Sequence, residues 1–229
     1  MSRKFPSIDT MLSNIYRFWI SLPYVFDNSK SYWKERYKTG GNSGKGSYNE
    51  LAEFKAHILN QFVLKYKINT VMEFGCGDGN QLMHCNYPVY LGFDISPDAI
   101  ARCQELFAGD DSKTYKLMKE YNGETADLTL SLDVIFHLTE DQIFTEYMHR
   151  LFDASQKYVI IYSSNTDANS ITDGAHVKHR KFSKWVKRSK PEWKLLKHIH
   201  NRYPIEEDSR NGSPSDFFIY HRHDKTSSG

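Results

Sequence analysis

The sequence is poor in cysteine, with only Cys76, Cys85 and Cys103 among its 229 residues. The three thiols include no Cys-x-x-Cys pair, and they form no metal-ligand pattern with histidine. An odd number of cysteines also cannot form a closed set of disulfides. These absences exclude a disulfide-stapled secreted domain, and free thiols are typical of a reducing compartment. We therefore expect a cytoplasmic protein.

Long apolar runs are missing as well. A membrane-spanning helix needs roughly 20 consecutive apolar residues, and the best candidate, residues 15–26, is interrupted by Arg17 and Pro23. The N-terminus lacks the apolar segment and the small-residue cleavage site of a signal peptide. We expect no membrane span. The length allows one sizeable domain, and aromatic residues, at 14% of the chain, are expected to supply much of its core.

Net charge is low, at +2, but the charges are unevenly distributed. Between His176 and Arg202 there are ten Lys and Arg residues and a single acid, Glu192, whereas the rest of the chain holds 20 basic and 27 acidic residues. Such segregation often marks a surface that meets an anionic partner. A lysine-rich helix exposed to solvent is the alternative interpretation, and the charge pattern alone leaves both open.

Apolar periodicity predicts alternating strands and helices. Leu51, Phe54 and Ile58 recur at helical spacing, whereas short β-rich apolar runs indicate strands. The alternation predicts a three-layer α/β fold with a mostly parallel sheet. The last two strands are expected to be antiparallel, because residues 203–215 are too few for a crossover helix. The predicted strands are residues 68–74, 89–95, 114–118, 127–132, 158–162, 193–199 and 216–220, and the predicted helices are residues 12–23, 31–37, 48–66, 97–107 and 141–152.

A glycine-rich loop follows the first predicted strand, in the segment Glu73-Phe74-Gly75-Cys76-Gly77-Asp78-Gly79. Glycines allow a sharp turn and let backbone N–H groups approach a ligand closely. A dinucleotide site needs Gly-x-Gly-x-x-Gly, but Asn80 occupies the third glycine position. Residues 41–47 resemble a phosphate loop only superficially, because no strand precedes them and Gly46 follows Lys45. The loop at 73–79 therefore indicates a nucleotide site of another type.

This loop resembles motif I of the class I S-adenosylmethionine-dependent methyltransferases. The segment Gly92-Phe93-Asp94-Ile95-Ser96 is similar to the end of that family's second strand, and residues 131–138, Ser-Leu-Asp-Val-Ile-Phe-His-Leu, are similar to its segment after the fourth strand. The resemblance covers about residues 68–162 well and the remainder loosely. It implies a Rossmann-like methyltransferase fold: a mostly parallel seven-stranded sheet with an antiparallel C-terminal strand, and an N-terminal helical cap.

The resemblance also implies a division of the chain and a cofactor. It assigns residues 1–66 to the helical cap, or lid, with the first core helix, residues 67–222 to the S-adenosylmethionine-binding core and residues 223–229 to a tail. One structural domain is expected overall. The implied cofactor is S-adenosyl-L-methionine. The loop and the later segments provide its predicted contacts at Glu73, Gly75, Cys76, Gly77, Gly79, Asp94, Ile95 and Asp133.

Two acids and one helix receive particular roles from the resemblance. Asp94 is expected to bind the ribose hydroxyls, since a carboxylate accepts charge-assisted hydrogen bonds from both. Asp133 is expected to hold the cofactor's amino group. Trp33, Arg36 and Tyr37 lie where this class often has a lid that closes over the cofactor. A purely structural aromatic helix is the alternative.

Methyl transfer depends mostly on alignment and exclusion of water, but an oxygen acceptor usually also needs a base. His137 is the predicted base, because it follows the fourth strand at the mouth of the cofactor site. A histidine that only packs at a helix start is the alternative. The basic stretch follows the fifth strand, on the family's usual substrate side, and provides four predicted acceptor contacts: His176, His179, Arg180 and Trp185.

No metal site is expected, although six histidines lie near the C-terminus. They lack the helical i, i+4 pairing with a nearby glutamate that marks many zinc enzymes. The six are His176, His179, His198, His200, His221 and His223.

The sequence narrows the chemical class of the methyl acceptor without identifying the acceptor. The Asn/Asp-Pro-Pro-Tyr/Phe motif of base and glutamine amino-methylation is absent after the fourth strand, and so is a Pro-Cys nucleophile. We therefore expect O-methylation of a small-molecule or glycan-like acceptor, with an anionic or phosphorylated group contacting the basic stretch. Methylation of RNA through that stretch, or a noncatalytic module that binds the cofactor, are the alternatives. The sequence does not indicate the oligomeric state.

Overall fold

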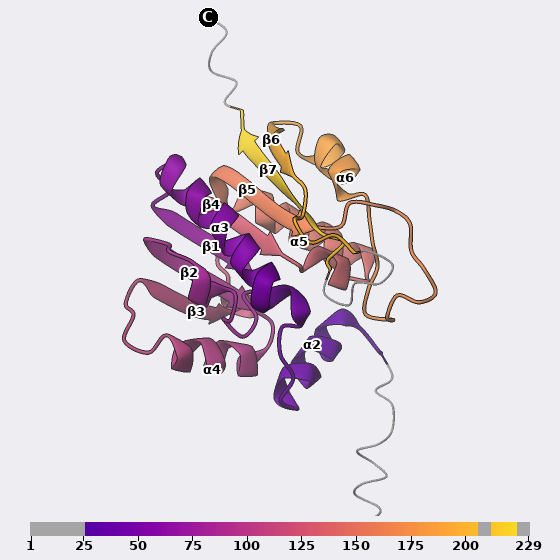
Figure 1. The fold of residues 1–229 in the computed structure, drawn as a ribbon, viewed down its shortest axis with the longest axis horizontal. Coiled ribbons are helices and arrows are strands. Elements are labelled where there is room, and N and C mark those ends of the chain that lie inside the picture. The colour runs from indigo at the N-terminus through magenta and orange to yellow at the C-terminus, as the bar shows by residue number, and fades with distance from the viewer. Residues whose placement is uncertain (1–25, 206–211, 224–229) are drawn as a thin grey trace, which may run out of the picture.

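A computed structural model describes residues 26–205 and 212–223 (Figure 1). Within these residues the chain forms one seven-stranded sheet. The strands are β1 (Thr70–Phe74), β2 (Val89–Asp94), β3 (Lys113–Leu117), β4 (Ala126–Leu132), β5 (Ser155–Ser163), β6 (Trp193–Ile199) and β7 (Asp216–Arg222). Their order in the sheet is β3-β2-β1-β4-β5-β7-β6, and β7 runs in the opposite direction to the other six described strands. The predicted sheet, with its antiparallel C-terminal strand, is confirmed.

Helices cover both faces of the sheet and make three layers (Figure 1). The described helices of eight residues or more are α2 (Ser29–Lys38), α3 (Asn49–Lys65), α4 (Pro97–Leu106), α5 (Asp141–Asp153) and α6 (Phe182–Ser189). One apolar cluster joins α3 and α4 to strand residues such as Val71 and Leu128, and a second joins α5 and α6 to Met72 and Val159. Adjacent residues of a strand, such as Val71 and Met72, point to opposite faces of the sheet, so the two clusters lie on opposite faces.

Local sequence signals explain several boundaries. At the start of α4, the Ser96 side chain accepts a hydrogen bond from the Ala99 N–H, and Pro97 occupies the first turn, where a missing N–H costs nothing. Strand β4 is buried along its whole length, as expected for a central parallel strand. The central strands β1, β4 and β5 each place several apolar residues within a short stretch, which is why their positions could be predicted within a few residues.

Helix α6 was not predicted. Phe182, Trp185 and Val186 are its buried side chains, at helical spacing, and they pack into the second apolar cluster. Its exposed positions hold basic residues such as Lys184 and Lys187. Part of the basic stretch is thus the solvated face of a helix, as the alternative interpretation had it.

The N-terminal part of the chain approaches the sheet from one end. The predicted helix over residues 12–23 lies outside the described residues. Helix α2, predicted as residues 31–37, begins after Asn28, whose side-chain oxygen accepts a hydrogen bond from the Ser31 N–H at 2.8 Å. Figure 1 shows α2 near the end of the sheet where the loops after β1 and β4 emerge. None of the described helices is long and apolar enough to cross a membrane.

Candidate functional site

The glycine loop after β1 is held against β2. Gly75, Gly77 and Gly79 have φ angles of 88°, 59° and 80°, a region that side chains strongly disfavour. The N–H groups of Gly75 and Cys76 both donate to the carbonyl oxygen of Phe93, at 2.7 and 3.0 Å. The loop therefore turns sharply at the carboxyl end of the sheet, where open α/β sheets bind ligands.

Side chains approach two of these glycines closely. A Cβ atom on Gly77 would collide with the Ser43 hydroxyl and lie 2.9 Å from the Tyr37 hydroxyl. A Cβ atom on Gly79 would meet Cys103 and Phe107, on the α4 side. Gly77 thus permits the lid segment to approach the loop, whereas Gly79 permits packing between the loop and α4.

Asp94, at the end of β2, is a buried carboxylate with two backbone donors. Its oxygens accept hydrogen bonds from the N–H of Gly77 at 3.0 Å and of Ser96 at 2.9 Å. Burial raises the pKa of Asp94 to about 6, although these hydrogen bonds act in the opposite direction. The acid is therefore fixed in place beside the glycine loop, with its charge held by backbone N–H groups.

A cavity of about 850 Å³ lies between the glycine loop, the carboxyl ends of β1, β2 and β4, and helix α2. Its volume is within the roughly 300–1,000 Å³ that is typical of small-molecule sites. We call it the larger cavity. Gly79 and Arg36 do not line it. Ten of the predicted site residues do: Trp33, Tyr37, Glu73, Gly75, Cys76, Gly77, Asp94, Ile95, Asp133 and His137.

The floor of the larger cavity holds polar groups with unused hydrogen-bonding capacity. Burial raises the pKa of Glu73 to about 7, and a hydrogen bond from the Tyr90 hydroxyl at 2.7 Å partly opposes this shift. The side-chain oxygen of Gln81 is buried and has no hydrogen-bond partner within the described part of the chain. Buried polar atoms are normally satisfied, so the floor is suited to a ligand that carries polar groups.

Lys55 and Ser215, which sequence reasoning missed, fix the carboxylate of Asp133. The Lys55 ammonium is completely buried and lies 2.8 Å from one Asp133 oxygen, and the Ser215 hydroxyl donates to the other at 2.9 Å. Asp133 itself has a φ of 57°, which is uncommon for a residue other than glycine. One signal was available: Lys55 is four residues from both Leu51 and Leu59, on the buried face of α3.

The C-terminal end of the lid helix α2 is held by α4. The Arg102 guanidinium donates to the carbonyl oxygens of Tyr37 and Gly41, both at 2.6 Å. The loop that follows is tied to the glycine loop, because the Ser43 N–H donates to the Asp78 carboxylate at 2.9 Å and the Asp78 N–H donates to the Ser43 hydroxyl at 3.0 Å. The end of α2 and the loop after it are therefore attached to both α4 and the glycine loop.

The N-terminal end of α2 is held by a separate contact. The carboxylate of Glu140, just before α5, accepts hydrogen bonds from the N–H and the hydroxyl of Ser29, at 2.8 and 2.7 Å. A carboxylate at a helix N-terminus also interacts favourably with the helix dipole. Both ends of α2 are thus attached to the core in the described conformation.

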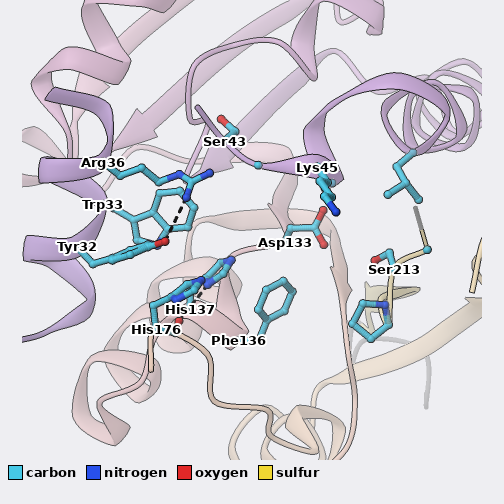
Figure 2. Close-up of a pocket in the computed structure, with 15 residues that line it drawn as sticks. Tyr32, Trp33, Arg36, Ser43, Lys45, Asp133, Phe136, His137, His176 and Ser213 are labelled. Carbon is cyan, nitrogen blue, oxygen red and sulfur yellow. Dashed lines mark hydrogen bonds between the residues drawn. The ribbon is translucent and has the colours of Figure 1, made fainter. Parts of the chain in front are cut away.

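A second cavity, of about 230 Å³, adjoins the larger one, and we call it the smaller cavity (Figure 2). The two cavities share Trp33, Ser43, Asp133 and His137 as lining residues. Figure 2 shows Tyr32, Trp33 and Arg36 of α2 facing His137 and His176. The other residues that line the smaller cavity are Gly44, Lys45, Gly46, Leu51, Phe136, Gly212, Ser213 and Pro214.

His137 lies at the boundary of the two cavities. Its Nδ1 atom is 3.1 Å from the carbonyl oxygen of His176. A carbonyl can only accept, so Nδ1 carries the proton and Nε2 keeps its lone pair. Burial lowers the pKa of His137 to about 4, and the neighbouring aromatic ring of Trp33, at 4.9 Å between centroids, helps to exclude water. The imidazole is therefore neutral at physiological pH, with one nitrogen free to accept a proton.

The smaller cavity combines aromatic surfaces with positive charge. Tyr32 stacks on the ring of His176, with centroids 4.4 Å apart, and the Arg36 guanidinium donates to the Tyr32 hydroxyl at 3.2 Å. Lys45 supplies a second cation to the lining. Asp133 is the one acid among the described residues of the lining, and it is already paired with Lys55. The described part of the lining thus contains two cations, Arg36 and Lys45, beside this paired acid.

Three of the four predicted acceptor contacts line neither cavity. His179 bonds to the Ser164 hydroxyl at 2.6 Å, and Arg180 donates to the carbonyl oxygens of Leu138 and Thr139 at 2.7 and 2.8 Å. Trp185 is buried in the second apolar cluster. Among the four, only His176 lines the smaller cavity. The side chains of His179, Arg180 and Trp185 thus contact the protein itself in the described structure, and the acceptor role of the basic stretch stays a prediction.

The strand order, the glycine loop and the acid at the end of β2 together define a Rossmann-like nucleotide-binding site of the methyltransferase type. Residues 72–160 match the model of a family described as "Methyltransferase domain". Residues 72–160 therefore belong to a methyltransferase domain, and the chain has the fold of the class I S-adenosylmethionine-dependent methyltransferases, as predicted; the cofactor that such a domain implies is S-adenosylmethionine. A search of curated protein sequences finds no match.

Solved structures of methyltransferases share the fold at low sequence identity. The N-methyltransferase NodS from Bradyrhizobium japonicum WM9, in complex with S-adenosylhomocysteine, superposes with a TM-score of 0.62 at 13% identity, over 86% of this chain and 100% of that one. Magnesium protoporphyrin IX methyltransferase from Synechocystis PCC 6803, with bound S-adenosylmethionine, superposes with a TM-score of 0.58 at 12% sequence identity, over 88% of this chain and 100% of that one. The small RNA methyltransferase HEN1 superposes with a TM-score of 0.56 at 19% sequence identity, over 78% of this chain and 26% of that one. These acceptors are so diverse that the shared fold does not indicate one for this chain.

Proposed function

We propose that this methyltransferase transfers the methyl group to an oxygen of a small, anionic acceptor bound in the smaller cavity. The observation that carries the proposal is the junction of the two cavities at His137, with Arg36 and Lys45 lining the acceptor side. A volume of about 230 Å³ suits a small molecule or the end of a larger one. Arg is well suited to carboxylate and phosphate groups, because its planar donors match their oxygens.

The larger cavity is the proposed cofactor site, and its residues fit S-adenosylmethionine. The Asp94 carboxylate is rigidly held and suited to the ribose diol, and the floor at Glu73 and Gln81 offers polar partners for the charged methionine end. Trp33 and Tyr37 of the lid cover the cavity, so they shield the reaction from water. When bound, the cofactor supplies an electrophilic methyl group on a positively charged sulfur.

His137 is the proposed base. Its free Nε2 accepts the proton of the acceptor hydroxyl, while Nδ1–H stays bonded to the His176 carbonyl oxygen and fixes the orientation of the ring. Tyr32 and His176 provide flat surfaces that orient the acceptor. Asp133, held by Lys55 and Ser215, forms a fixed wall between the two cavities, and its charge favours the protonated imidazole as it forms.

Methylation of RNA is the second candidate. Exposed basic residues on α6 and β6, among them Lys187 and Lys197, favour it. Three observations give it less support: Lys184 pairs with Asp167, Lys190 pairs with Asp153, and no residue of α6 or β6 lines the smaller cavity.

The two candidates differ in where a labelled methyl group is transferred. Wild-type enzyme with methyl-labelled S-adenosylmethionine is incubated separately with the low-molecular-weight fraction and the RNA fraction of a cell extract. We expect label in small molecules that bind an anion-exchange resin. Label in RNA alone would contradict the proposal.

Arg36→Met is expected to lower kcat/KM for the labelled small acceptor about tenfold or more, mainly through KM, because one charge-assisted hydrogen bond contributes roughly 1.5–3 kcal/mol. Initial rates measured against acceptor concentration check this. Lys184→Met, a cation removed from α6, is the matched control and should leave kcat/KM unchanged. Equal losses in both variants would contradict an anion subsite at Arg36.

A further inference from the structure

The connected end of the β6–β7 pair, where β6 ends and β7 begins, holds two histidines and an aspartate that no part of the methyl-transfer site uses. We propose that His198, His200 and Asp216 bind one divalent transition-metal ion, of the zinc, cobalt or nickel type. One ligand atom from each residue lies within 4.8 Å of the other two. This site is independent of the cofactor and acceptor cavities, since none of the three residues lines either of them.

The backbone explains why the three side chains meet. His198 and His200 are two residues apart at the end of a strand, so their side chains project from the same face. In the antiparallel ladder His198 lies opposite Phe218 and Ile199 lies opposite Phe217. Asp216 immediately precedes Phe217, at the start of β7, so the antiparallel register brings it opposite His200. Strand geometry thus places a His-x-His pair beside a carboxylate.

The distances suit a metal of tetrahedral or related geometry. One Asp216 oxygen lies 2.8 Å from His198 Nε2 and 3.0 Å from His200 Nδ1. Bonds of about 2.0 Å in a tetrahedral site separate neighbouring ligand atoms by about 3.3 Å. An ion therefore needs the Asp216 oxygen to move away from each of the two nitrogens by only a few tenths of an ångström, which small rotations of the two histidine side chains can provide.

The ligand types select the class of metal. Imidazole nitrogens with one carboxylate favour zinc, nickel, cobalt or copper, whereas magnesium and calcium prefer all-oxygen sites. Three protein ligands leave at least one position for water, and the exposed side chain of His200 gives the ion direct access. The proposed ion is therefore exchangeable and partly hydrated.

Neighbouring groups hold two of the three ligands in place. The other Asp216 oxygen accepts a hydrogen bond from the Asn201 N–H at 2.8 Å, which orients the carboxylate. The ring of His198 stacks on Phe218, with centroids 4.3 Å apart. Such outer contacts orient ligands and raise metal affinity.

The location gives the site a consequence for the enzyme. Asp216 directly follows Ser215, which donates to the Asp133 carboxylate, and Gly212, Ser213 and Pro214 line the smaller cavity. An ion bound by His198, His200 and Asp216 would link the end of β6 to residue 216, which directly follows the cavity-lining residues 212–214 and Ser215. Metal binding is therefore expected to stabilise one wall of the smaller cavity from outside, without contact with the reacting groups.

The test is a titration of the full chain, purified without a histidine tag, with Zn²⁺ by calorimetry and with Co²⁺ by visible absorption. We expect one Zn²⁺ per chain and a Co²⁺ spectrum with ligand-field bands. His200→Ala, at an exposed position that should not disturb folding, and Asp216→Asn are each expected to weaken Zn²⁺ binding at least about tenfold. Circular dichroism confirms that each variant is folded.

The matched control is the second His-x-His pair, His221 on β7 and His223 just after it, which forms no three-ligand cluster with other described residues. The double variant His221→Ala/His223→Ala should retain wild-type Zn²⁺ affinity. The proposal is wrong if wild-type protein binds no Zn²⁺, if His200→Ala binds as tightly as wild type, or if the His221/His223 variant loses binding instead.

Discussion

Replacing His137 with alanine is expected to lower kcat by about two to four orders of magnitude, the usual contribution of a positioned general base. The loss should be in kcat rather than in the affinity for the cofactor, because His137 is proposed to act on the acceptor's proton. Steady-state kinetics at saturating cofactor, with calorimetry of cofactor binding in parallel, separate the two effects. His179→Ala is the matched control, since His179 is a nearby histidine that lines neither cavity.

The pH dependence of kcat/KM for the acceptor provides a second test of the same assignment, because kcat/KM reports the pKa of groups in the enzyme before the acceptor binds. A base is active when deprotonated, and burial lowers the pKa of His137 to about 4. At saturating cofactor, kcat/KM for the acceptor should therefore fall only as the pH decreases towards about 4 and should be flat between pH 5.5 and 8. An inflection near the ordinary histidine pKa of about 6.5 would contradict a buried neutral base. So would wild-type kcat in the His137→Ala variant.

Replacing Lys55 with methionine is expected to lower the free energy of unfolding by about 3 kcal/mol. The Lys55 ammonium is completely buried and pairs with Asp133 at 2.8 Å. Removing one partner of a buried pair typically costs 3–5 kcal/mol, because the other charge is left without compensation. Our value is at the lower end of that range because Asp133 keeps its hydrogen bond from Ser215 and is partly accessible to water. Urea unfolding measures the change.

The double variant Lys55→Met/Asp133→Asn is the control for this prediction. Asparagine tolerates the positive φ of Asp133 and carries no charge, so most of the stability lost in the single variant should be recovered. A loss below about 1 kcal/mol in Lys55→Met, or additive losses in the double variant, would mean that the ion pair contributes little. Either result would remove Lys55 from the residues that hold the wall between the cavities.

The parts of the fold that depend on contiguous sequence were predictable. Each central strand has several apolar residues within a short stretch. The glycine loop and Asp94 lie in two local segments at the ends of successive strands. Helix α6 was missed because its eight residues contain only Phe182, Trp185 and Val186 as buried positions among basic neighbours. In so short a segment the basic residues obscure the apolar pattern, and the apolar positions become recognisable only when the sheet on which they pack is known.

The contacts that complete the site depend on residues distant in sequence. Lys55 and Ser215 are 78 and 82 positions from Asp133, and they meet it only when α3 packs on the sheet and β7 pairs with β5. Arg180 was predicted to meet the acceptor, but carbonyl oxygens next to α5 satisfy its donors, and sequence spacing does not reveal such local partners. His198 and His200 were set aside because helical spacing was the criterion, whereas on a strand a spacing of two brings side chains together.

The central claim is that the donor and acceptor cavities meet at His137. A crystal structure of the complex with S-adenosylhomocysteine tests it most directly. We expect the ribose hydroxyls on the Asp94 carboxylate and the sulfur atom at the junction lined by Trp33, Asp133 and His137. A sulfur atom at the opposite end of the larger cavity, beside Ile143 and Arg150 of α5, would contradict the claim.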